Sequence, residues 1–152
     1  MRRKDRERDE DFAIGVIDTA PYGVLSVVDG QGLPYAIPLS LIRIDKVLYF
    51  HSAKEGTKND IFDKEPRVCI TFVDNVIPAA NEFTTEYDSA IVKGVISEVK
   101  DDDEKILALR KLSEHFCPAH MDKFQESIKM SLGRTAVFKV SMEEITGKQK
   151  KL

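Results

Sequence analysis

The segment from Leu48 to Phe62, LYFHSAKEGTKNDIF, combines residue types that together could bind an anion. An apolar stretch runs into a small polar loop, and Thr57 follows where a helix N-cap is expected, with Asp60 three residues later as a capping box prefers. The first turn of a helix presents free backbone N–H groups and the positive end of a dipole. Because Lys54 and Lys58 add full positive charges, the segment predicts a loop that binds a nucleotide phosphate.

The same residues also fit a plain capped helix, since capping residues are common and phosphate sites are rare. His51, just before the loop, could likewise be a strand residue whose ring is satisfied by a backbone carbonyl. Both interpretations stay open from the residues alone.

A second group of chemistry-bearing residues lies in HFCPAHMD, which holds His115, Cys117, His120 and Asp122. These side chains can ligate zinc or haem iron, but their spacing fits no standard zinc motif. Pro118 is expected to separate two helices here, so the side chains need not converge. We therefore predict no metal site, and expect His120 to act as a lid over a bound ligand in preference to His115.

Length and composition bound the remaining possibilities. The 152 residues, 42% hydrophobic and 32% charged, predict a single domain spanning residues 1–152. A net charge of -3 and the lack of a long basic patch argue against a nucleic-acid partner. No apolar run reaches the roughly 18 residues of a membrane span, and no signal-peptide pattern opens the chain, so we expect a cytoplasmic protein. Cys69 and Cys117 are expected to be reduced thiols, with Cys69 packed in a strand.

The hydrophobic pattern predicts the elements that would position these residues. A short helix is expected from Asp11 to Ala20, ended by Pro21. Three strands, joined by the DGQG turn and an Asp45–Lys46 turn, are expected to form an antiparallel meander: residues 22–28, 34–44 and 47–51. After a short helix over 58–64, the strand over 67–74 is apolar on both faces, which is typical of a central buried strand.

The second half of the chain predicts a loop, a long strand and two helices. The loop covers 75–82, and the strand over 83–100 should bulge or bend at Gly94. The acidic run DDDE starts a helix that ends before Pro118, and a shorter helix then carries Met121, Phe124 and Ile128 inward. The last strand is expected over 134–141, followed by a solvated basic tail. Six strands joined mostly by hairpins predict a mainly β protein with flanking helices, closed as a small antiparallel barrel because a flat sheet would leave exposed edges.

Five segments in this order resemble the flavin-binding split β-barrel superfamily that includes pyridoxamine 5'-phosphate oxidase, and within it the nitroimidazole-resistance or nitroreductase-like branch. They are MRRKDRE at the start, YAIPLSL at 35–41, YFHSAKEGTKND at 49–60, YDSAIVKG at 87–94 and ITGK at 145–148. The resemblance spans nearly the whole chain and implies a six-stranded antiparallel split β-barrel.

The resemblance also implies a homodimer with a flavin, usually FMN, in each crevice between protomers. By similarity, the backbone of Pro38, Leu39 and Ser40 would meet the polar rim of the isoalloxazine ring. The ribityl chain would be lined by His51, Ser52 and Ala53, and the phosphate would be held by Thr57 and Lys58. Tyr87, Ser89 and Lys148 would approach the flavin from the partner protomer. From the residues alone, Tyr87 and Ser89 could instead be a cross-strand packing pair, and Lys148 part of the solvated tail.

These implications predict an FMN-dependent oxidoreductase that reduces a small, flat, electron-poor acceptor such as a nitroaromatic. The flavin would perform the chemistry, so the sequence requires no dedicated catalytic acid or base. Where a proton is needed, Tyr87, His120 or water could supply it. The alternative is a binding module of the same fold that holds flavin or haem as a sensor or store without turnover. FAD or a deazaflavin could also replace FMN, because the contacts to the ring would be largely backbone.

Overall fold

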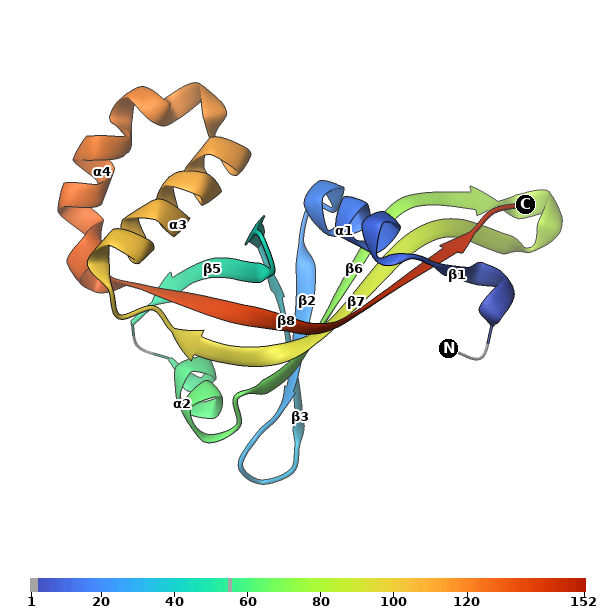
Figure 1. Cartoon of the computed structure of the whole chain (residues 1–152), viewed down its shortest axis with the longest axis horizontal. Coiled ribbons are helices and arrows are strands. Elements are labelled where there is room, and N and C mark those ends of the chain that lie inside the picture. Colours follow the sequence, from blue (N-terminus) through green and yellow to red (C-terminus); the bar gives the residue numbers. More distant parts are fainter. Residues whose placement is uncertain (1–2, 55) are drawn as a thin grey trace.

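Antiparallel strands form one sheet in the order β3-β2-β6-β7-β8-β5-β4, and β1 pairs with the end of β8 (Figure 1). The computed structural model describes residues 3–54 and 56–152, without the side chains of residues 57 and 58. The strands are β1 (Glu7–Arg8), β2 (Gly23–Val28), β3 (Pro34–Leu39), β4 (Ile42–Ile44), β5 (Val47–Ala53), β6 (Arg67–Ala79), β7 (Thr84–Glu98) and β8 (Thr135–Lys150).

The two ends of this strand order meet, which closes the sheet into a barrel. β3 and β4 stand at opposite ends of the order, yet only Ser40 and Leu41 separate them in the chain. The sheet must therefore curl until its ends lie together. The predicted antiparallel split barrel with flanking helices is confirmed, with eight strands in place of six in the part of the chain that the structure describes. One extra strand is the two-residue β1, and the other arises from the division of the predicted strand over 34–44.

That division makes the predicted meander wrong. β3 pairs with β2 and β4 pairs with β5, so the segment 34–44 passes from one end of the strand order to the other. Leu41 turns into the core at the break and is 7% exposed. Gly23 leaves room for it, since a Cβ at Gly23 would lie 2.9 Å from the Leu41 Cδ1.

Four helices flank the barrel in the part of the chain that the structure describes: the first two contribute side chains to its core, and the last two pack on the outer face of its wall. They are α1 (Glu10–Thr19), α2 (Thr57–Lys64), α3 (Asp102–Phe116) and α4 (Phe124–Ser131), with four short 3₁₀ turns, η1 (Lys4–Arg6), η2 (Ala80–Glu82), η3 (Pro118–Lys123) and η4 (Leu132–Arg134). Asp9 caps α1 by accepting a hydrogen bond from the Phe12 backbone N–H at 2.9 Å, and Asp101 caps α3 by accepting from the Glu104 N–H at 2.8 Å. No helix among the described residues is long and apolar enough to cross a membrane.

Two apolar clusters hold the fold together. Inside the barrel, the Phe50 and Phe138 rings stack at 5.4 Å and Phe62 meets both rings edge-on. The second cluster lies between the outer face of β4, β5 and β8 and the α3–α4 helices, where Phe124 points inward as predicted.

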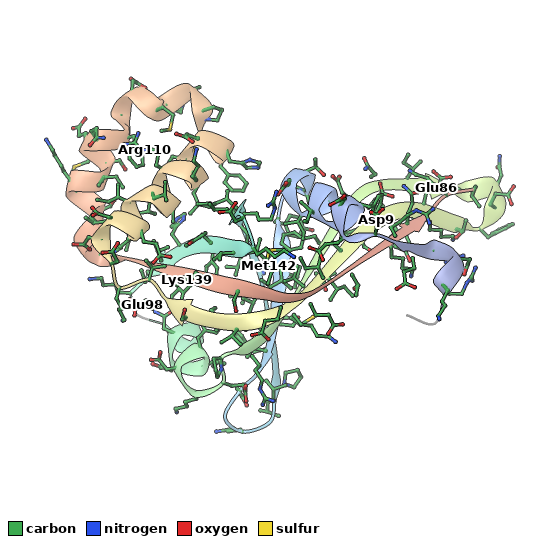
Figure 2. All side chains as sticks on the ribbon, viewed as in Figure 1. Asp9, Glu86, Glu98, Arg110, Lys139 and Met142 are labelled. Carbon is green, nitrogen blue, oxygen red and sulfur yellow. The ribbon has the colours of Figure 1, made fainter. Side chains whose placement is uncertain are left out.

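A polar contact also joins α3 to the sheet. Lys139, labelled on β8 in Figure 2, donates to the Glu104 carboxylate of α3 at 2.8 Å. Glu104 also accepts from the Tyr49 hydroxyl at 2.9 Å. Burial is the main cause, and this hydrogen bond the second, that raises the pKa of the Tyr49 phenol to about 12.

The predicted irregularity at Gly94 is confirmed. The register between β7 and β8 shifts between Lys93 and Gly94. The β8 backbone comes so close here that a Cβ at Gly94 would lie 1.9 Å from the Ser141 carbonyl oxygen. Only glycine leaves space for this crossing of the two longest strands.

Two further predictions are wrong in the same region. The expected loop over 75–82 is mostly strand, because β6 bulges between Asp74 and Ile77 and then resumes its pairing with β7 as far as Ala79. Asn75 makes the bulge possible with a left-handed φ of 51°. The expected basic tail is also strand, since β8 continues to Lys150 alongside β7 and β1. We call this extension, residues 74–89 with 146–150, the arm; Figure 1 shows it projecting beyond α1.

β6 occupies the central position that its sequence predicts, between β2 and β7. In the single chain, however, only one of its faces is buried. Val68, Ile70 and Phe72 point into the barrel, whereas Cys69 and Thr71 are half-exposed and Val73 is 45% exposed. The outer face of the central strands is therefore apolar and uncovered.

Candidate functional site

The predicted site residues fall into two groups. The first lies where β3 and β5 end and α2 begins, and the second lies on the arm. Both groups are reached from the outer face of the barrel. Within one chain the structure does not bring the two groups into contact, as the register described below shows.

Side chains alternate along β5, and this alternation decides what each residue presents. Ser52 points into the barrel, is 7% exposed, and donates its hydroxyl to the Ala53 carbonyl at 2.8 Å. His51 and Ala53 are exposed on the outer face. A ligand on that face would therefore meet the His51 side chain but only the backbone of Ser52.

A groove of about 370 Å³ separates the end of β5 from the α3–α4 helices. Ser40 and His51 lie on its barrel side. The helical side is mostly apolar and includes Leu109, Leu112, Phe116, Phe124 and Ile128. An apolar slot with a few polar groups at one wall suits a flat, partly polar ring.

The outer edge of β3 borders this region and agrees with the edge position predicted from Pro38. β3 pairs with β2 and with no other described strand. Its second edge therefore carries the backbone groups of every second residue outside the sheet ladder. Such groups can bind the polar rim of a heterocycle.

The loop after β5 is fixed by Asn59, which sequence reasoning missed. Its Nδ2 donates to the carbonyls of Ala53 at 3.2 Å and Lys54 at 2.6 Å. Its Oδ1 is buried and has no hydrogen-bond partner among the described residues. A ligand hydroxyl would satisfy this oxygen. An asparagine in the first turn after a glycine-containing loop was the available signal.

α2 begins one residue earlier than expected. Gly56, with a φ of 147°, is the N-cap and Thr57 is the first helical residue, so the prediction of Thr57 as the cap is wrong. Glycine can hold this backbone angle without strain, and it leaves the first helical N–H groups without a side-chain partner. The side chains of Thr57 and Lys58, predicted to hold a phosphate, lie outside the described part of the structure.

The second group forms a positively charged patch on the arm. Ser89 on β7 lies opposite Lys148 on β8. The Lys148 Nζ is 5.1 Å from the centroid of the Tyr87 ring. A hydrogen bond from Lys148 lowers the pKa of the Tyr87 phenol, and the charges of Arg6 and Lys150 act in the same direction. Lys148 is thus part of a strand and contacts Tyr87, and does not belong to a solvated tail.

A buried polar network, also missed by sequence reasoning, lies beneath this patch. Asp88 is 5% exposed and accepts hydrogen bonds from Asn75 Nδ2 at 2.8 Å and Gln149 Nε2 at 3.0 Å. Arg8 in turn donates to the Gln149 Oε1 at 3.1 Å. The network joins β1, β7, β8 and the β6 bulge, and so fixes the register of the arm.

Cross-strand register shows how the two groups are related. One row across the outer face runs through Pro38, Val24, Thr71, Ile91 and Thr146, and the next row holds Val73, Ser89 and Lys148. Strands in a sheet lie about 4.8 Å apart, so three steps separate Pro38 from Ser89 by roughly 14 Å. Both groups therefore share one face but cannot hold the same atoms of a ligand within one chain.

The residues of HFCPAHMD do not form a metal site. No group of three or more His, Cys, Asp or Glu side chains among the described residues could hold a metal ion. Cys117 and His120 line a hollow of about 430 Å³ beside α4, whereas His115 faces a separate cleft near the Asp18–Arg43 ion pair. The expected role of His120 as a lid stays a prediction. A larger hollow, of about 770 Å³ near Tyr35, Cys69 and Lys93, contains none of the predicted site residues.

Comparisons with known proteins agree with this architecture. Residues 9–149 match the family model described as pyridoxamine 5'-phosphate oxidase. A search of curated protein sequences gives no significant match.

Solved structures with the same fold include a protein assigned to 5-nitroimidazole antibiotic resistance from Bacteroides thetaiotaomicron, with 24% identity, a TM-score of 0.77, and coverage of 93% of this chain and 84% of that one. The flavocytochrome Anf3 from Azotobacter vinelandii has 20% identity, a TM-score of 0.84, and coverage of 100% and 72%. The FAD and haem binding protein from Mycobacterium smegmatis has 19% identity, a TM-score of 0.81, and coverage of 97% and 74%.

Proposed function

The chain belongs to the pyridoxamine 5'-phosphate oxidase family, and from that premise we propose that it binds a flavin, by preference FMN, in the groove between β5 and the α3–α4 helices. The observation that carries this proposal is the order of features along the chain from His51 to Thr57. The apolar slot at His51 and the start of α2 at Thr57 lie at opposite ends of one short loop. A ligand with a flat ring, a hydroxylated chain and a terminal phosphate matches that order.

The residues present fit such a ligand part by part. The free edge of β3 offers backbone donors and acceptors to a ring, and the apolar wall at Leu112 and Phe116 excludes water from its face. The unpartnered Asn59 Oδ1 can accept a hydrogen bond from a chain hydroxyl. The first turn of α2 offers N–H groups to a phosphate. FAD would use the same ring contacts, and the structures of flavin- and haem-binding proteins with this fold keep that alternative open.

Two copies of the chain complete the site in this proposal. The outer face of the central strands carries exposed Val73 and Ile91, which a homodimer would bury. Tyr87, Ser89 and Lys148 would then reach the flavin of the partner protomer, since their distance from Pro38 is too large within one chain.

A charge reversal at the phosphate end tests the assignment. Lys58→Glu is expected to lower the flavin content of the purified protein severely, because a carboxylate would repel the phosphate. Lys64→Glu, at the other end of α2, is the matched control and should keep full flavin content. If both variants purify with the same flavin content as the unmodified chain, the phosphate does not bind at the start of α2.

We further propose that the bound flavin passes electrons to a small, electron-poor acceptor such as a nitroaromatic. A flavin supplies hydride and single-electron transfer when bound. The chain's contribution is to polarise the ring through β3 and to admit a flat acceptor beside it. Stopped-flow oxidation of the reduced protein by nitro compounds, quinones and oxygen should show a saturable dependence on at least one acceptor.

The second candidate function is a flavin or haem store without turnover. It is favoured by the solved structures with this fold, which include a flavocytochrome and an FAD and haem binding protein. A store would be oxidised slowly by every compound, with rates that rise linearly with concentration and never saturate.

A further inference from the structure

The tip of the arm exposes an unusual amount of apolar surface. Val76 is 56% exposed, Ile77 is 53% exposed, and Phe83 is 98% exposed. Phe83 also has a left-handed φ of 49°, which a bulky residue seldom adopts. Exposed apolar side chains on a projecting hairpin indicate a contact surface.

The α3–α4 region offers a receptor of matching character. The groove of about 370 Å³ and the hollow of about 430 Å³ share the lining residues Ser113, Cys117, Phe124 and Ser127, so they are adjacent; together we call them the α3–α4 depression. Its walls include Leu112 and Phe116 on one side and Met130, which is 65% exposed, on the other.

One charge at the arm tip has a possible partner in the depression. Residues 77–85, at the tip of the arm, carry one acid, Glu82, and no Lys or Arg. Among the described residues, the depression is lined by one basic side chain, Lys123, and one acid, Glu126. Opposite charges at the rim orient two surfaces that meet through apolar cores.

The two surfaces cannot meet within one chain. Figure 2 shows Glu86 on the arm and Arg110 on α3 at opposite ends of the molecule. Phe83 is six residues beyond Ser89, or about 20 Å along an extended strand. If Ser89 of a second copy lies at the flavin beside His51, the tip of that copy's arm lies within about 20 Å of His51 and can reach the α3–α4 depression.

We therefore propose that the arm tip of each chain docks into the α3–α4 depression of a second copy, where Phe83 closes the mouth of the flavin groove. The proposal rests on the proposed function, because Ser89 is placed at the flavin there. It adds a specific docking partner for the arm, and it makes each site incomplete without the Phe83 of the other chain.

Disulfide trapping tests the contact directly. Phe83→Cys, in a Cys69→Ser background, places a thiol at the arm tip while native Cys117 lies exposed in the depression. Mild oxidation with diamide is expected to convert most of the protein into a covalent dimer. Adding Cys117→Ser should abolish that dimer. Gln31→Cys, at the exposed turn between β2 and β3, is the matched control and should give little dimer. Equal yields from the two sites, or no Cys117-dependent dimer, would overturn the docking.

Flavin release provides a second measurement, independent of thiol chemistry. Phe83→Ser removes the closing side chain and is expected to speed flavin dissociation roughly tenfold, the loss typical of a buried aromatic anchor. Leu33→Ser, which alters a 56% exposed apolar residue on another hairpin, should leave the rate unchanged. Unchanged release and no trapped dimer in a protein that still holds flavin would reject the docking alone. A chain that binds no flavin would reject the proposed function itself.

Discussion

The Tyr87 phenol on the arm lies among basic side chains. Lys148, Arg6 and Lys150 all favour its ionised form, and the hydrogen bond from Lys148 is the largest cause of the lowered pKa. Lys148→Met should therefore raise the pKa of Tyr87 toward the value of a free tyrosine. Lys150→Met should raise it less, because Lys150 acts only through its charge at a distance.

Ultraviolet absorbance at alkaline pH measures this titration, and Tyr87→Phe identifies which of the four tyrosines is responsible. The assignment fails if Lys148→Met leaves the Tyr87 transition in place while Lys150→Met moves it.

Single residues were predictable where a local pattern carries the information. The alternation at Tyr87 and Ser89, the edge position of Pro38 and the crowded Gly94 all follow from neighbours along the chain. Asp88 was not predictable, because its partner Gln149 is 61 residues away. The sequence predicted Thr57, not Gly56, as the N-cap of α2, because threonine is a preferred capping residue and a glycine N-cap has no side chain that would signal it.

At the scale of elements, the crossing of β7 and β8 depends on Gly94. Gly94→Ala should destabilise the protein by about 3 kcal/mol, because the added Cβ meets a backbone oxygen that cannot turn aside. Gly133→Ala, where no atom lies within 4 Å of the added Cβ, is the control and should change stability by less than about 0.5 kcal/mol. Denaturant unfolding compares the two, and equal effects would contradict this account of the bulge.

The attachment of α3 to the barrel should depend on pH through Glu104. The hydrogen bond from Lys139 lowers the pKa of this carboxyl. The contribution of Glu104 to folding stability is therefore fully present above the unfolded pKa of about 4.3, and it is lost as the pH falls through the lower pKa of the folded state. Glu104→Gln should cost about 1–2 kcal/mol at neutral pH, and the difference from the unmodified chain should shrink below about pH 4.

Glu114→Gln on the same helix is the control for this measurement. Its partner Lys111 forms an exposed pair, which is worth little. Chemical unfolding at several pH values would contradict the assignment if the two substitutions cost the same, or if the Glu104→Gln cost persisted undiminished in acid.

Elements with a strong period and a clear start were predictable, as α1 and α3 show with their aspartate caps. The elements that differed from prediction depend on distant pairing. β6 continues through a polar segment because β7 lies beside it, and β8 continues through a basic segment because β7 and β1 flank it. Local composition at 75–82 and 145–150 resembles a loop and a tail, and only the partner strands override it.

At the scale of the whole molecule, the barrel was predictable from the number of hairpin-joined strands and the need to hide their edges. The manner of closure was not, since it follows from two residues, Ser40 and Leu41, that carry one segment between the ends of the sheet. The separation of the site residues into two groups was implied only by the family resemblance, which places Tyr87, Ser89 and Lys148 on the partner protomer, because their distance from Pro38 depends on strand order. That separation is what makes a second copy part of the proposed site.

The absorption spectrum of the purified protein, followed by heat release and chromatographic identification of the chromophore, tests the central claim most directly. The account predicts the two visible bands of an oxidised flavin and the release of about one FMN per chain. A colourless protein that also fails to take up added FMN or FAD would contradict the flavin site and leave only the fold.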